Sequence, residues 1–253
     1  MALVTKEFAP KKPWKQRGLI AAAAALAVGV VVIAVAPDGE VDEAESVTSA
    51  ETTVSVTHTA TAPANTAKGS LVPQIPSATK SPADSDWLTA APQGVSWQRV
   101  DGVPLPFSAS DGPTRIEGAV AEGYTRSPQG AALAAIQIAM RMLFSPDFES
   151  VVREQTAATS TERDQLISAR SGQPIINADA VTAATLQPAA FKVGAYSDQD
   201  ATVYYAYPAQ DGVYRIARMS VTWQDDDWKY TGRMSPDAPE LPATADISSF
   251  TAF

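Results

Sequence analysis

Hydrophobic residues follow three successive patterns along the chain. An unbroken apolar run from Gly18 to Ala36 contains no charged or polar side chain. Residues 37–86 are rich in Ser, Thr, Ala and Pro and contain almost no large apolar side chains. From residue 87 onward, apolar positions recur first with a helical period and then with the alternation of β-strands. We therefore expect a membrane-spanning helix, a disordered stalk and one folded domain.

The clearest helical pattern begins at Ser127. Ser127 suits the N-cap of a helix, and Pro128 suits its first position, where the missing N–H costs no hydrogen bond. Apolar side chains then recur on one helix face, at Ala132, Ala135, Ile136, Ala139, Met140 and Leu143. Arg141 lies near the end of this run, where a cation complements the helix macrodipole. Because alanine is small, we expect another element to approach this helix closely.

Two more helices are predicted directly after the first. Pro146 marks the start of one that continues to about Ala157. Thr159 and Glu162 have the spacing of a capping box, which indicates the start of a third helix. Gly172 is typical of a residue just beyond a helix end, so this helix should end there.

The period of the pattern then changes to that of β-strands. Four strands are predicted, over residues 189–196, 201–207, 213–223 and 228–234. The short turns between them favour antiparallel pairing in chain order. Helices followed by strands are typical of an α+β domain, so we expect three helices packed on a curved antiparallel four-stranded sheet.

Other segments contain turn-forming residues and few regular patterns. The lead-in from Trp87 to Pro106 and the stretch VDGVPLPFSASDGPT are predicted to be irregular because they contain several Pro residues and two Asp-Gly pairs. The predicted parts of the chain are a cytoplasmic tip (1–17), a transmembrane helix (18–36), a disordered stalk (37–86), an extracytoplasmic domain (87–234) and an irregular tail (235–253).

Charge on either side of the apolar run predicts its orientation in the membrane. At about 1.5 Å per residue, the run is roughly 28 Å long, close to the hydrocarbon thickness of a bilayer. Residues 1–17 carry a net charge of +4, whereas residues 37–85 carry −5. The positive-inside rule therefore predicts a single-pass plasma-membrane protein with a cytoplasmic N-terminus and an extracytoplasmic domain. Ala34-Val35-Ala36 also fits a signal-peptide cleavage site, so a released domain remains the alternative.

Composition excludes several classes of function. The chain has no Cys and one His, His58, which lies in the predicted stalk. A zinc site of the usual ligands, thiol chemistry and a serine nucleophile with a histidine base in the domain are therefore excluded. The net charge of −8 over residues 86–253 makes direct binding of nucleic acid unfavourable.

The remaining polar clusters are more typical of turns than of sites. Asp225, Asp226 and Asp227 lack the spacing of a calcium loop and are interpreted as a solvated hairpin tip. The stretch Asp111-Gly112-Pro113-Thr114 is interpreted as a turn, and no phosphate-binding glycine loop occurs. We expect no catalytic residues, no metal and no cofactor, and hence no enzyme.

The end of the predicted sheet resembles a known fold. It has the pattern V-x-W-x-D-x-D-W-K, formed by Val221, Trp223, Asp225, Asp227 and Trp228. Helices followed by a meander with this ending resemble the cone-shaped fold of nuclear transport factor two. The resemblance implies helices packed into the concave face of a bent sheet, and it implies fold rather than function.

A second resemblance lies upstream. The segments VPLPFSASDGPT and GYTRSPQGAALAAIQIAMR resemble a family of actinobacterial membrane-anchored proteins of integrative and conjugative elements. The matching residues are Gly123, Tyr124, Ser127, Pro128, Gly130, Ala131, Ala134, Ala135 and Arg141. The predicted topology is also similar to the inner-membrane assembly factors of type IV secretion and to the TcpC conjugation proteins. The resemblance implies a scaffold of a DNA-transfer channel and no catalytic residues.

Three hypotheses about function follow. The first is a non-enzymatic membrane-anchored assembly component of a conjugation or secretion apparatus, whose partners are the lipid bilayer and other membrane components or further copies of itself. The alternative is an extracytoplasmic domain that binds a small molecule or a peptide, which an open apolar cavity would favour and a filled core would disfavour. The third is an enzyme, which would need an acid and a base in that cavity.

Overall fold

The computed structural model describes residues 70–71, 80–174 and 176–253. The predicted cytoplasmic tip, the predicted transmembrane helix and most of the predicted stalk (37–69 and 72–79) lie outside the described residues. No helix within the described ranges combines the length and the apolar character that a bilayer crossing requires.

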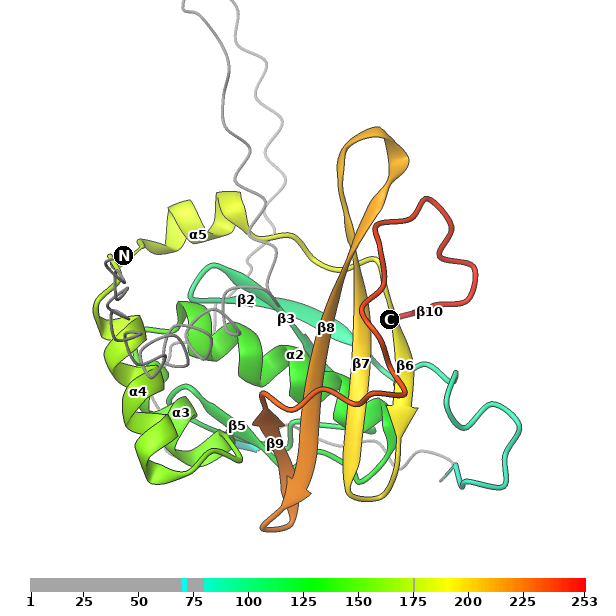
Figure 1. Ribbon diagram of the computed structural model, residues 1–253, viewed down its shortest axis with the longest axis horizontal. Helices are drawn as coiled ribbons and strands as arrows, with labels where there is room; N and C mark the ends of the chain where they lie inside the picture. The colour runs from blue at the N-terminus through cyan, green and yellow to red at the C-terminus, as the bar shows by residue number, and fades with distance from the viewer. Residues whose placement is uncertain (1–69, 72–79, 175) are drawn as a thin grey trace, which may run out of the picture.

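A five-stranded antiparallel sheet forms one side of the domain (Figure 1). The strand order is β10-β6-β7-β8-β9. The strands are β6 (Ala190–Tyr196), β7 (Asp200–Pro208), β8 (Tyr214–Gln224), β9 (Asp227–Thr231) and β10 (Thr251–Ala252). The four predicted strands and their pairing in chain order are confirmed, and β10 is a fifth strand that the sequence pattern does not predict.

The β8–β9 turn shows why this meander forms. Asp225 and Asp226 are its two central residues, and their φ angles are 54° and 58°. Two-residue turns with positive φ match the twist of antiparallel strands, and aspartate accepts this conformation better than most residues. Gln224 and Asp227 therefore face each other as the first pair of the ladder.

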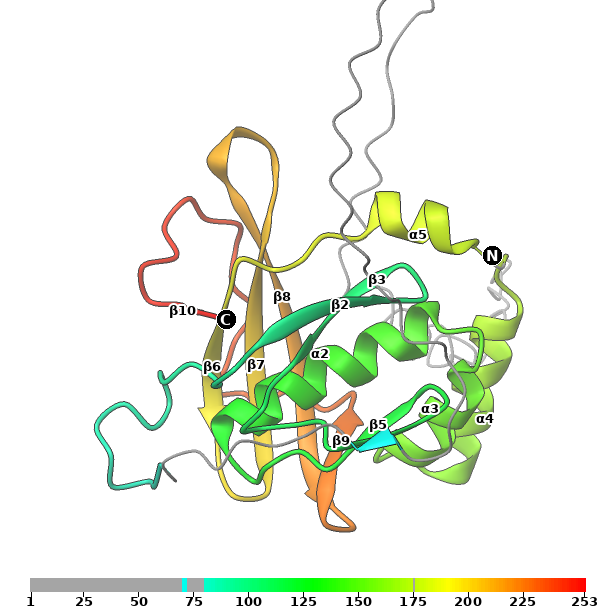
Figure 2. The ribbon, with the colours of Figure 1, turned by 180° about the vertical axis from the view of Figure 1, so that it is seen from behind.

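Helix α2 (Pro128–Phe144) lies at the centre of the molecule. Ser127 caps it as predicted, and its hydroxyl accepts a hydrogen bond from the Gly130 N–H. Fifteen of its 17 residues are buried, because strands β7 to β9 cover one side and the β2–β3 hairpin the other (Figures 1 and 2). The alanines make this enclosure possible, since small side chains let both layers approach the helix axis.

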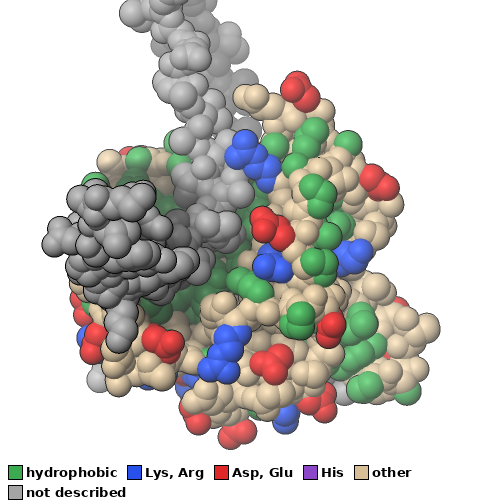
Figure 3. All heavy atoms as spheres, viewed as in Figure 1, with side chains coloured by type: hydrophobic (Ala, Val, Ile, Leu, Met, Phe, Trp, Pro, Cys, Tyr) green, Lys and Arg blue, Asp and Glu red, His purple; other side chains and the backbone are tan. Residues whose placement is uncertain are grey.

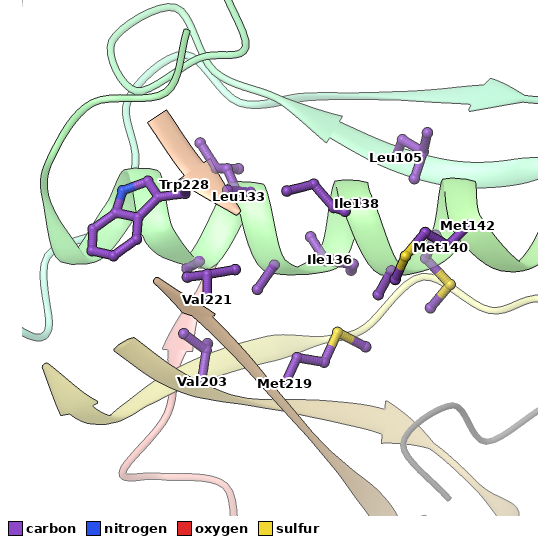
Figure 4. Packing of buried hydrophobic residues seen from close by; sticks show 14 of the residues in the cluster. Leu105, Leu133, Ile136, Ile138, Met140, Met142, Val203, Met219, Val221 and Trp228 are labelled. Carbon is purple, nitrogen blue, oxygen red and sulfur yellow. The ribbon is translucent and has the colours of Figure 1, made fainter. Parts of the chain in front are cut away.

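Apolar side chains fill the space on both sides of α2. Figure 4 shows Leu105 of β3 on one side of the helix and Val203 and Met219 of the sheet on the other. Leu133, Ile136 and Ile138 of α2 are fully buried between them. At roughly 1.5–3 kcal/mol for each large side chain buried, this cluster supplies the main stabilisation of the domain.

The described part of the chain contains four α-helices, one more than predicted, and a short 3-10 helix, η2 (Gln210–Gly212). The α-helices are α2, α3 (Phe148–Gln155), α4 (Ser160–Ser171) and α5 (Ala178–Ala184). The capping box of Thr159 and Glu162 and the end of α4 at Gly172 are confirmed. The additional helix α5 is short, starts at the cap Asn177 and buries only Val181, so its apolar pattern is too weak to predict it.

The predicted irregular lead-in is wrong over residues 96–107, which form a hairpin. Strands β2 (Ser96–Val100) and β3 (Val103–Phe107) pair around the turn Asp101-Gly102. Pro104 and Pro106 suggested a loop. The two residues that close a two-residue hairpin form a hydrogen-bonded pair, and from there hydrogen-bonded and non-hydrogen-bonded pairs alternate along the strands. Both prolines therefore lie in non-hydrogen-bonded pairs, where no backbone N–H is needed. The fully buried β3 forms the layer that covers α2.

A small sheet and the tail also differ from the predictions. Strands β4 (Arg115–Glu117) and β5 (Val120–Glu122) pair with each other, and β1 (Ser70–Leu71) pairs with β4. Two residues of the predicted stalk thus belong to a sheet. The tail, predicted to be irregular, ends in β10 at the outer edge of β6.

Candidate functional site

Five of the nine family-motif residues, Gly123, Tyr124, Ser127, Pro128 and Gly130, gather where β5 leads into α2, together with Trp223 and Trp228 from the end of the sheet. Gly123, with φ of 82°, leaves the strand in a backbone conformation that favours glycine. A Cβ atom at Gly123 would overlap the Thr114 hydroxyl, and one at Gly130 would overlap the carbonyl oxygen of Thr125. Gly123 is therefore required by its backbone conformation and by the neighbouring Thr114 side chain, and Gly130 by the close approach of the Thr125 backbone.

Asp227 holds the start of this segment. Its carboxylate accepts hydrogen bonds from the backbone N–H groups of Gly123 (2.8 Å) and Tyr124 (3.2 Å), and also from that of Trp228 (2.9 Å). The prediction that all three aspartates form a solvated tip is correct for Asp225 and Asp226, which are exposed, and wrong for Asp227, which is buried. Burial raises the pKa of the Asp227 carboxyl above its usual value, while the three N–H donors act in the opposite direction.

A second carboxylate orders the turn before α2. Asp111 accepts hydrogen bonds from the hydroxyls of Thr125 (2.8 Å), Ser127 (3.2 Å) and Ser110. Thr125 also donates its backbone N–H to the Asp111 carbonyl oxygen over 3.2 Å. The predicted turn at Asp111 is confirmed, and its side chain additionally orients the helix cap.

Aromatic side chains cover the same junction. The Trp228 indole is fully buried and donates its Nε1–H to the Thr125 carbonyl oxygen over 2.9 Å. Trp223 packs edge-on against Trp228, with ring centroids 5.2 Å apart, and the Arg126 guanidinium lies 5.2 Å from the Trp223 ring centroid. The tryptophans therefore fasten the β8–β9 hairpin to the helix start.

Ala135 and Arg141 lie away from this junction. Ala135 is fully buried in the middle of α2. Arg141 was expected to complement the helix dipole from the last turn, but its side chain is buried and makes specific contacts. Its Nε donates to Gln137 Oε1 over 2.9 Å and its Nη1 to the Ala119 carbonyl oxygen over 3.2 Å. Burial lowers the pKa of the Arg141 guanidinium.

Two buried glutamines connect the layers and were missed as polar contacts by sequence reasoning. Gln137 donates to the Pro106 carbonyl oxygen of β3 over 2.7 Å. Gln155 of α3 donates to the Ala121 carbonyl oxygen of β5 over 2.5 Å and accepts from the Ala121 N–H over 3.3 Å. The only sequence signal for either residue is a glutamine on an otherwise apolar helix face.

Most of these polar side chains form hydrogen bonds with the protein backbone. Within the ranges that the structure describes, no group of His, Asp and Glu side chains is arranged to hold a metal ion. Two buried tyrosine hydroxyls, those of Tyr124 and Tyr207, have no hydrogen-bond partner there. Burial raises the pKa of both hydroxyls well above the usual tyrosine value, so neither serves as a base at neutral pH.

The surface carries mixed charge. Figure 3 shows acidic and basic side chains interspersed on the face viewed, as expected for a solvated surface. Among the residues that the structure describes, the exposed large apolar side chains are Leu88, Ile176 and Leu186.

The family model described as a domain of unknown function, DUF8175, matches residues 61–253, which is well over half of the chain. No curated protein and no solved structure matches the chain. The chain therefore belongs to the DUF8175 family.

Proposed function

We propose that this protein is a non-enzymatic, membrane-anchored assembly component of a conjugative DNA-transfer or secretion apparatus. The observation that carries the proposal is the filled interior of the domain. The space between α2 and the sheet, where a cone-shaped fold would hold a ligand, is occupied by side chains such as Ile136, Met219 and Trp228, all fully buried.

The polar residues of the candidate site support the same proposal. Asp111, Asp227 and Arg141 contact backbone groups and neighbouring side chains that order the fold. Because these charged groups serve the architecture of the domain, we infer that the domain interacts with its partners through its surface. The uncharged run 18–36, with basic residues before it and acidic residues after it, supports an anchor that holds this surface outside the cytoplasm.

We also propose that the domain has the cone-shaped fold of nuclear transport factor two and that the chain is related to proteins of actinobacterial integrative and conjugative elements. Helix α2 lies across a twisted antiparallel sheet that ends in the Trp223–Trp228 hairpin, an arrangement compatible with the cone-shaped fold of nuclear transport factor two. The G-Y-T-R-S-P-Q-G block resembles proteins of actinobacterial integrative and conjugative elements. The second resemblance favours a scaffold over an enzyme, whereas the first concerns the fold alone.

A transfer assay tests this function. The gene is deleted from its host element and replaced by one of three chains. These are the full chain, a chain that lacks residues 87–253, and a secreted chain in which a cleavable signal peptide replaces residues 1–36. We expect that only the full chain restores transfer, because assembly needs both the anchor and the domain. Unchanged transfer after deletion, or full restoration by the secreted chain, would contradict the proposal. A His58→Ala chain serves as a control and should restore transfer normally.

Binding of a small polar ligand is the second candidate. It is favoured by one observation, the two buried hydroxyls of Tyr124 and Tyr207 that lack partners in the described part of the chain. Unpaired buried hydroxyls are uncommon and are often satisfied by a water molecule or a ligand. Native mass spectrometry of the purified full chain tests this candidate, which predicts a bound species that disappears in a Tyr124→Phe, Tyr207→Phe chain.

A further inference from the structure

The last residues of the chain attach to the sheet as an added strand. In β10, Thr251 lies opposite Phe191 and Ala252 opposite Ala190, in antiparallel register on the outer edge of β6 (Figures 1 and 2). Strand β10 covers only two of the seven residues of β6. Within the described ranges, Lys192 to Tyr196 have no strand on this outer side. An exposed strand edge is a template for pairing with another extended segment.

Phe253 fixes the position of the added strand. Its ring contacts three aromatic rings from three strands, at centroid distances of 5.0 Å to Trp97, 4.9 Å to Phe191 and 6.4 Å to Tyr205. Phe191 and Tyr205 are themselves fully buried. Aromatic contacts of this kind add about 0.5–1.5 kcal/mol each beyond the area they bury. The three rings thus form a seat for one aromatic side chain.

Polar contacts add specificity along the same segment. The Thr251 hydroxyl donates to the Thr89 carbonyl oxygen over 2.9 Å. The Lys192 ammonium donates to the Ser249 hydroxyl over 3.2 Å and lies 5.8 Å from the Phe250 ring centroid. Backbone pairing, one aromatic seat and these contacts together recognise the sequence Ser249-Phe-Thr-Ala-Phe253.

A short connection joins the segment to the rest of the tail. Upstream, Thr244 is fixed by two backbone hydrogen bonds to Tyr214, of 2.7 and 3.0 Å. Residues 245–250 connect this attachment to β10, and most of them are exposed. A connection this short keeps the effective concentration of the segment high, so a lone chain binds its own segment. Chains held close together by a membrane anchor can exchange segments, because the contacts are the same in either arrangement.

We propose that the outer edge of β6, together with the seat formed by Trp97, Phe191 and Tyr205, binds residues 249–253 of a second copy of this chain. Donation of this segment from each chain to the next joins neighbouring domains head to tail. The proposal deepens the assembly function and rests on it for its biological role.

Pairs of cysteine variants test the exchange, because the chain has no cysteine of its own. Ala190 and Ala252 lie opposite each other, and opposed residues have Cα atoms about 4.5–5.5 Å apart, within the disulfide range. Full-length Ala190→Cys and Ala252→Cys chains, differently tagged, are mixed in one membrane and oxidised mildly. A disulfide between the two tags forms only if the segment of one chain lies on β6 of another. We expect the mixed chains to yield at least five times more disulfide-linked dimer than either variant oxidised by itself.

Phe253→Ala in the Ala252→Cys chain is the matched control. Loss of the ring should lower the yield of mixed dimer about tenfold, because this half-buried side chain supplies much of the contact. Circular dichroism melting of each variant checks that it is folded.

The outcomes separate this inference from the proposed function. One combination of results would contradict the exchange. In it, the double variant, Ala190→Cys with Ala252→Cys, forms its disulfide only within one chain, and the mixed single variants give no more dimer than either single variant by itself. The segment is then an internal strand only, and the exchange is wrong even if the protein is needed for transfer. A mixed dimer that is insensitive to Phe253→Ala would also overturn the proposed seat. Conversely, a Phe253-dependent dimer in a protein dispensable for transfer would uphold the exchange and contradict the assembly function.

Discussion

At the scale of single residues, polar side chains decide how the layers of this domain are joined. Asp227 binds the N–H groups of Gly123 and Tyr124, which lie 104 and 103 residues before it in the chain. Replacement by alanine leaves buried N–H groups without an acceptor, at about 1–3 kcal/mol each. We expect Asp227→Ala to lower the free energy of unfolding by about 3 kcal/mol, measured by urea denaturation. Asp225→Ala, at the exposed tip of the same hairpin, should lower it by less.

The pH dependence of stability should show the raised pKa of Asp227. A carboxyl with a raised folded pKa stabilises the fold when protonated, and this contribution is lost as pH rises through that pKa. Asp227→Asn cannot titrate, so its stability deficit relative to the native chain should narrow as pH rises from about 4. Urea denaturation across this pH range measures the difference. A deficit that widens with pH would show that the three N–H donors outweigh burial.

Removal of two tyrosine hydroxyls is expected to stabilise the fold, whereas removal of the Asp227 carboxylate is expected to destabilise it. The hydroxyls of Tyr124 and Tyr207 are buried without partners in the described structure. Removing an unsatisfied buried hydroxyl relieves a desolvation cost of about 1 kcal/mol. Tyr124→Phe and Tyr207→Phe should each raise the midpoint of thermal unfolding. Tyr205→Phe is the control, because its hydroxyl donates to the Ala132 carbonyl oxygen over 2.5 Å and its loss should lower the midpoint.

At the scale of elements, the link from β5 into α2 depends on the absence of a side chain at Gly123. Gly123 and Gly212 both have positive φ, 82° and 71°, but only Gly123 lies against another residue, Thr114. Gly212→Ala should cost about 1 kcal/mol for its backbone conformation alone. Gly123→Ala should cost about 2 kcal/mol more, because the added methyl group overlaps Thr114. Equal losses in the two variants, measured by urea denaturation, would show that the junction accommodates a side chain.

Local sequence signals predicted the elements that they define by themselves. The cap at Ser127, the capping box at Thr159 and the four alternating strands each depend on residues close in sequence. The β2–β3 hairpin was missed because Pro104 and Pro106 were interpreted without their register. Strand β10 was missed because two residues carry no period, and the role of Asp227 because its partners are distant in the chain. Most of the motif residues lie at the junction of β5 and α2, where they order its backbone.

At the scale of the whole molecule, the proposed architecture is an anchored domain whose filled interior leaves its surface for partners. The proposed function depends on assembly with other proteins. The most direct test of assembly is to measure the mass of the complex that contains the full chain, after extraction from native membranes in mild detergent. One chain has a mass of 26.6 kDa. We predict particles that hold several copies together with other membrane proteins, and that become smaller when residues 249–253 are removed. Particles of a single chain, at the concentration found in the cell, would contradict the proposed function.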